Sequence, residues 1–121
     1  MLNMGVRRIF LSRSVTGMSK GIDALAAEVR TQFGMDPMSG DAFLFLGAGF
    51  ARIKILVWDG SGFWLCYKRL DRGGTFAVPR SVGKNGTPGA VVMSHAELAL
   101  LLEGIEVMQF RRCQQPSASI R

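Results

Sequence analysis

The sequence contains few of the residues that metal and catalytic sites use most often. It has one histidine, His95, and two cysteines, Cys66 and Cys113. Neither cysteine has a second cysteine or a histidine at metal-ligand spacing. Cys66 lies in an apolar run and Cys113 in a polar segment, so we expect two reduced thiols rather than a disulfide. We expect no metal and no other cofactor.

Long apolar runs and targeting signals are also missing. No stretch approaches the roughly 20 apolar residues that a membrane span requires. The positively charged start, residues 1–8, is not followed by an apolar stretch of signal-peptide length. We therefore expect a cytoplasmic protein with no membrane partner.

The chain does contain enough apolar residues for a core and a clear excess of positive charge. Its 121 residues are 48% hydrophobic, which predicts a single folded domain over residues 1–108 and a polar, basic tail over residues 109–121 that frays. Fifteen Lys and Arg against nine Asp and Glu give a net charge of +6. Such an excess favours a polyanionic partner, most commonly nucleic acid, although it also serves solubility alone.

Apolar periodicity predicts two helices. The first follows Ser19 as N-cap and ends at Gly34. Its buried face has helical spacing and consists of Ile22, Leu25, Ala26, Val29 and Phe33. The second follows Ser94, and Glu97 is placed to complete a capping box. Its buried face consists of Leu98, Leu101, Leu102 and Ile105.

The remaining apolar runs predict strands over residues 6–11, 42–46, 52–58, 63–69 and 75–78, with a mobile loop over residues 81–89. The fold class is therefore α+β, in the order β-α-β-β-β-β-α. We expect a small, mainly antiparallel sheet with a central β-hairpin and two packing helices.

The hairpin is the most informative segment. Two β-rich runs flank residues 59–62, whose Asp-Gly-Ser-Gly sequence is typical of a tight turn. Pairing Trp58 with Phe63 sets the register, because side chains alternate with period two. One face then carries the pairs Val57 and Trp64, Ile55 and Cys66, and Ile53 and Lys68. The other carries Trp58 and Phe63, Leu56 and Leu65, Lys54 and Tyr67, and Arg52 and Arg69.

The end of the hairpin away from the turn is a candidate nucleic-acid site. It gathers Arg52, Lys54, Tyr67 and Arg69 on one face, with Lys68 adjacent. Cationic side chains neutralise phosphates, and a tyrosine stacks on a base or bonds a phosphate. The alternative is an ordinary solvated face of the sheet.

Nearer the turn, the same face is apolar. Leu56, Leu65, Trp58 and Phe63 lie there, so they either complete a core covered on both faces or form a patch that binds a protein partner or a second copy of the chain.

Catalytic chemistry has weaker support. A nuclease needs carboxylates that converge on divalent metal ions, and the candidates are Asp36, Asp41 and Asp59. Asp36 and Asp59 lie in turn sequences, where aspartate is favoured because it bonds its own backbone. His95 and Ser94 are better explained as helix surface and helix cap. We therefore expect no catalytic residues.

The chain resembles a known family through several motifs taken together. These are MSKGID at residues 18–23, DPMSG at 36–40, RIKILVWDGSGFW at 52–64, YKRL at 67–70 and LLEGI at 101–105. In this order they resemble the second open-reading-frame product, the TnpB-type accessory protein, of insertion-sequence-66 transposons. The resemblance runs from about residue 6 to residue 105.

This resemblance implies a non-enzymatic protein that supports transposition in the bacterial cytoplasm, with DNA and a separate transposase as partners. The alternatives are a metal-dependent nuclease that acts on element ends and a protein adaptor that does not touch DNA. Two departures from the family pattern remove positive charge, namely Ser19 in place of an Arg and residues 47–51 in place of a basic run. We therefore expect weak DNA affinity.

Overall fold

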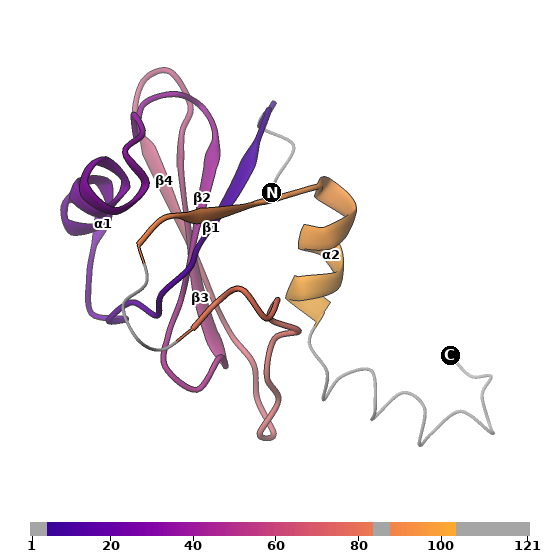
Figure 1. The fold of residues 1–121 in the computed structure, drawn as a ribbon. Helices are drawn as coiled ribbons and strands as arrows, with labels where there is room; N and C mark the ends of the chain where they lie inside the picture. Colours follow the sequence, from indigo (N-terminus) through magenta and orange to yellow (C-terminus); the bar gives the residue numbers. More distant parts are fainter. Residues whose placement is uncertain (1–4, 84–87, 104–121) are drawn as a thin grey trace.

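The computed structural model describes residues 5–83 and 88–103. Five strands and two helical segments follow one another in the order that the sequence predicts, and the α+β class is confirmed (Figure 1). The elements are β1 Ile9–Ser12, α1 Ile22–Glu28, the π-helical turn η1 Val29–Phe33, β2 Ala42–Leu46, β3 Arg52–Trp58, β4 Phe63–Arg69, β5 Ala90–Met93 and α2 His95–Glu103.

The strands form one mixed sheet in the order β4-β3-β2-β1-β5. Neighbouring strands are antiparallel except β1 and β2, which are parallel. Parallel neighbours need a long crossover connection, and α1 with η1 lies in the connection between these two strands. The strand order leaves β4 and β5 as the two edge strands of the sheet.

Each face of the sheet carries a buried apolar cluster, and one helical segment covers each face (Figure 1). On one face α1 and η1 pack with Leu25, Val29 and Phe33 against Phe43, Phe45, Leu56 and their neighbours. On the other face α2 packs with Leu98 and Leu101 against the side chains that alternate with these. Strands that are buried on both faces have apolar residues at successive positions. Strands β1 and β2 follow this pattern, with Ser12 as the one polar residue. The two-sided core predicted as one alternative is confirmed.

The helix predictions hold for two of the three predicted ends and for most of the buried faces, in which Ile22 and Leu102 are only half-buried. Leu25, Ala26, Val29 and Phe33 are buried, and Gly34 ends the first helix with φ 65°. Ser94 and Glu97 form the predicted capping box, with bonds of 3.0 Å and 2.7 Å. The predicted N-cap Ser19 is wrong. Gly21 occupies that position, because Ser19 lies inside a turn closed by the Lys20 N–H and the Gly17 carbonyl.

Two strand predictions need correction. The first strand begins at Ile9 rather than residue 6, although Val6 is still buried. Residues 75–78 form no strand; Phe76 is buried there and its N–H donates to the Phe50 carbonyl at 2.8 Å. The fifth strand is β5, which pairs with β1. A β-rich composition does not say which segment finds a partner strand.

Some predictions fall on residues 84–87 and 104–121, which lie outside the described residues. These are the centre of the mobile loop, Ile105, Cys113, the domain boundary at residue 108 and the tail over residues 109–121.

Candidate nucleic-acid interface

The register of the β3–β4 hairpin is the one predicted, from the pair Arg52 and Arg69 to the pair Trp58 and Phe63. The turn is built around the carboxylate of Asp59. Its Oδ1 accepts the backbone N–H groups of Ser61 at 2.9 Å and Gly62 at 3.0 Å, and its Oδ2 accepts the Trp64 indole N–H at 2.7 Å. These bonds stabilise the ionised form and lower the pKa of Asp59 from 3.8 to about 2.

The basic hairpin end, defined here as Arg52, Lys54, Tyr67 and Arg69, lies at the opposite end of the same two strands. Arg52 faces Arg69 across the strands, and Lys54 faces Tyr67. Arg52 and Arg69 are exposed and Tyr67 is 53% exposed. Like charges directly opposite one another are destabilising. Asp71 Oδ1 lies 3.5 Å from Arg69 Nε and compensates this pair in part.

Lys54 connects the basic hairpin end to the start of α1. Its Nζ donates to the Lys20 carbonyl at 2.8 Å and lies 5.7 Å from the centre of the Tyr67 ring. Lys20 in turn pairs with Glu28 on α1. The ammonium group of Lys54 therefore has a structural partner. Both arginines remain exposed, although Arg69 lies beside Asp71.

Lys68 is separated from the other predicted nucleic-acid residues. It pairs with Ile53 on the opposite face of the hairpin, as the alternation predicts. Its Nζ donates to the carbonyl of Leu102 near the end of α2 at 2.7 Å. A cation at this position also interacts favourably with the helix dipole. Lys68 thus belongs with α2 rather than with the basic hairpin end.

The four residues predicted to bind a protein partner differ in their exposure. Leu56 is fully buried under α1, so its side chain stabilises the core and is not available to a partner. Phe63 and Leu65 are half-buried against the same cluster. Trp58 is half-buried and contacts Phe63 edge to face, with the ring centres 5.0 Å apart.

Sequence reasoning missed two exposed apolar features. The Trp64 ring, held by Asp59, is 54% exposed on the α2 side of β4. A groove of about 470 Å³ lies between β5, residues 77–79 and α2. Val92 and Leu100 line it and are 67% and 59% exposed. The pairing Val57 with Trp64 was visible in the sequence, but the edge position of β4 and the existence of β5 were not.

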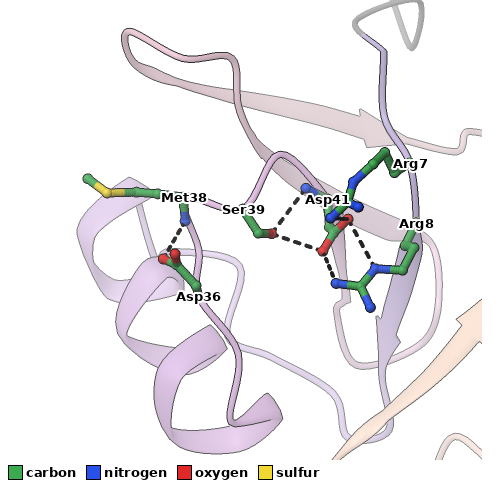
Figure 2. A network of polar contacts seen from close by, with 6 residues as sticks. All are labelled: Arg7, Arg8, Asp36, Met38, Ser39 and Asp41. Atoms are coloured by element: carbon green, nitrogen blue, oxygen red, sulfur yellow. Dashed lines mark hydrogen bonds and ion pairs between the residues drawn. The ribbon is translucent and has the colours of Figure 1, made fainter.

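The carboxylates considered for catalysis have structural partners. Asp36 accepts the Met38 N–H at 2.9 Å, as a turn aspartate does, and Asp41 is bonded to Arg8 (Figure 2). Within residues 5–83 and 88–103, no three His, Cys, Asp or Glu side chains cluster in a way that could hold a metal ion. His95 is exposed at the start of α2.

No helix among the described residues is long and apolar enough to cross a membrane.

A model of the family described as IS66 Orf2-like protein matches residues 7–112. The chain belongs to this family. Its members are accessory proteins of insertion-sequence transposition, so the resemblance carried by the sequence motifs is confirmed.

Two relatives of this IS66 Orf2-like protein come from Sinorhizobium fredii. The uncharacterized protein y4hO is 35% identical over 99 residues, which cover 82% of this chain and 81% of the relative. The uncharacterized protein y4jC is 30% identical over 105 residues, which cover 87% of this chain and 85% of the relative. No solved structure matches the chain.

Proposed function

We propose that this IS66 Orf2-like protein binds DNA phosphates through the basic hairpin end and acts as a non-enzymatic subunit beside the transposase of its element. The observation that carries the proposal is the direct opposition of Arg52 and Arg69 on an exposed face. A phosphate between two guanidinium groups would relieve their repulsion and accept hydrogen bonds from both.

Two neighbouring side chains support the same chemistry. Tyr67 is more than half exposed and its ring lies beside Lys54, so it offers a face for stacking or a hydroxyl for a phosphate. The net charge of +6 adds long-range attraction for a polyanion. Phosphate interactions of this kind position a protein on DNA and carry no sequence information by themselves.

The protein partner we propose is the transposase of the same element. Support comes from membership of the transposition family and from the exposed Trp64 ring, because tryptophan is enriched among residues that dominate protein interfaces. Co-purification of the two proteins, with and without element-end DNA, tests this partner. A Trp64→Ala variant that co-purifies as well as the native protein would place the interface elsewhere.

The test of DNA binding replaces Arg52, Lys54 and Arg69 together with Gln. We expect affinity for element-end and unrelated duplexes to fall about equally, since these side chains bind phosphates rather than bases. The dependence of log affinity on log salt should flatten by roughly one unit for each phosphate that is no longer neutralised. Fluorescence anisotropy at several salt concentrations measures both quantities, and circular dichroism checks the fold.

Lys68→Gln is the matched control, because Lys68 lies on the same strand as Arg69 but on the opposite face. It should change affinity less than the triple variant does. If the triple variant and the native protein bind with the same salt dependence, the basic hairpin end is a solvated surface. A flat salt response of the native protein would favour the adaptor that does not touch DNA.

A further inference from the structure

A second pair of arginines lies at the other end of the sheet from the basic hairpin end. Arg7 and Arg8 immediately precede β1, and β2 begins beside them at Ala42. Ala42 pairs with Val57, near the hairpin turn, whereas Arg52 is at the far end of β3. The length of β3 separates the two ends by about 20 Å.

A buried carboxylate holds Arg8 of this pair in place and lies beside Arg7 (Figure 2). The side chain of Asp41 is 1% exposed. It accepts hydrogen bonds from Arg8 Nε at 3.4 Å, Arg8 Nη2 at 2.9 Å and Ser39 Oγ at 2.9 Å. Arg8 is also fixed from a second direction, because its guanidinium lies 5.2 Å from the centre of the Phe10 ring.

The pair retains donors and charge after Asp41 is satisfied. A guanidinium has five N–H donors, and the Arg8 side chain, 56% exposed, uses one edge for Asp41. Arg7 is 69% exposed and its Nη2 lies 3.9 Å from Asp41 Oδ1, beyond hydrogen-bond distance. Two guanidinium groups against one carboxylate leave a net charge of +1 in this cluster.

We propose that Arg7 and Arg8 form a second anion site, which takes a phosphodiester group of nucleic acid, with Asp41 as the positioning residue. Because Asp41 and Phe10 already fix the Arg8 guanidinium, little of the Arg8 side-chain entropy remains to be lost on binding. A polymer with regularly spaced phosphates is the ligand that can reach this pair and the basic hairpin end together. The Arg7–Arg8 site is nevertheless independent of the hairpin in sequence and in structure.

The experiment uses the full chain and a fluorescent DNA duplex in a salt titration. Arg7→Gln is the informative change, because Arg7 lies outside the hydrogen bonds that hold Asp41 and its loss should leave the melting temperature unchanged. We expect affinity to fall about threefold to tenfold and the salt slope to fall by roughly one unit. Arg7→Lys should keep the slope. Arg30→Gln, which removes an exposed arginine on η1, is the control for the reduced net charge.

The same change in the background of the triple hairpin variant separates the two proposals. If the hairpin proposal fails, the triple variant binds as the native protein does, while Arg7→Gln still weakens binding. If the Arg7–Arg8 proposal fails, Arg7→Gln is indistinguishable from Arg30→Gln in both backgrounds. Native protein that binds no duplex at low salt overturns both. Equal inhibition of the native protein and Arg7→Gln by inorganic phosphate would also count against the second site.

Discussion

Strands β3 and β4 are partners in one hairpin and contain similar residues, but their environments differ. In β3, Ile53, Ile55, Leu56 and Val57 are buried, whereas every residue of β4 is half-buried or exposed. Each strand has five hydrophobic and two cationic residues, and the residues pair one to one. Composition therefore does not explain the difference in burial. It follows from position, because β3 lies between β2 and β4 while β4 is the edge of the sheet.

This difference in burial separates residues that stabilise the core from residues that are exposed and can bind a partner. Apolar side chains of β3 are used on both faces of the sheet, against α1 and toward α2. On β4 the corresponding positions leave Trp64, Tyr67 and Arg69 open to solvent. An edge strand with cationic residues is also protected from pairing with another chain. Strand β3 therefore stabilises the core, and the edge strand β4 carries exposed side chains that are proposed to bind partners.

The largest loss of stability is expected at Leu56, which lies opposite Leu65 and tests the difference in burial between β3 and β4. Leu56→Ala should lower the free energy of unfolding by about 2–5 kcal/mol, the usual cost of a cavity at a fully buried leucine. Leu65→Ala should cost clearly less, because Leu65 is half-buried on the edge strand. Urea denaturation with linear extrapolation measures both values. Equal losses would show that the edge strand is as tightly packed as the central one.

The next largest loss of stability is expected in the hairpin turn. Gly60 has φ 105°, a conformation that a β-branched residue adopts only with strain. Gly60→Val should therefore destabilise the fold by more than about 1 kcal/mol. Gly62→Ala is the matched control, since a Cβ at Gly62 meets nothing within 4 Å and its φ is not positive. An unchanged melting curve for Gly60→Val would mean that β3 and β4 do not depend on this turn.

The hairpin could be predicted from the sequence because its determinants are local. A tight turn and period-two alternation determine both the register and the face of each side chain, including Lys68 on the face away from Arg52. The capping box of α2 was visible for the same reason, since Ser94 and Glu97 are three residues apart.

Features that join distant segments could not be predicted. The choice of β5 over residues 75–78 depends on which segment reaches the free edge of β1. The burial of Leu56 depends on how α1 crosses the sheet. The bond between Arg8 and Asp41 connects residues 33 positions apart. The hairpin register already placed Arg52 and Arg69 on one face, but only the fold brings Arg7 and Arg8 to Asp41.

The smallest expected effect concerns Asp59, which links the turn to the exposed edge strand through Trp64. Hydrogen bonds from the Ser61 and Gly62 N–H groups and from the Trp64 indole lower its pKa from 3.8 to about 2. A carboxyl group whose pKa is lowered in the folded state contributes stability above its unfolded pKa and loses this contribution as pH falls through the folded value. Asp59→Asn should therefore be less stable than the native protein at neutral pH, and the difference should shrink between about pH 4 and pH 2.

Urea denaturation of both proteins across this pH range, followed by circular dichroism, measures the effect. Asp59 is fully exposed, and solvent screens its interactions, so the change should be smaller than that of Gly60→Val. Trp64→Phe removes only the indole donor and should reproduce part of the loss while the two backbone bonds remain. A constant difference between native and Asp59→Asn protein down to about pH 2 would contradict the lowered pKa. In that case the exposed Trp64 ring would owe its orientation to strand pairing rather than to the charge of the turn.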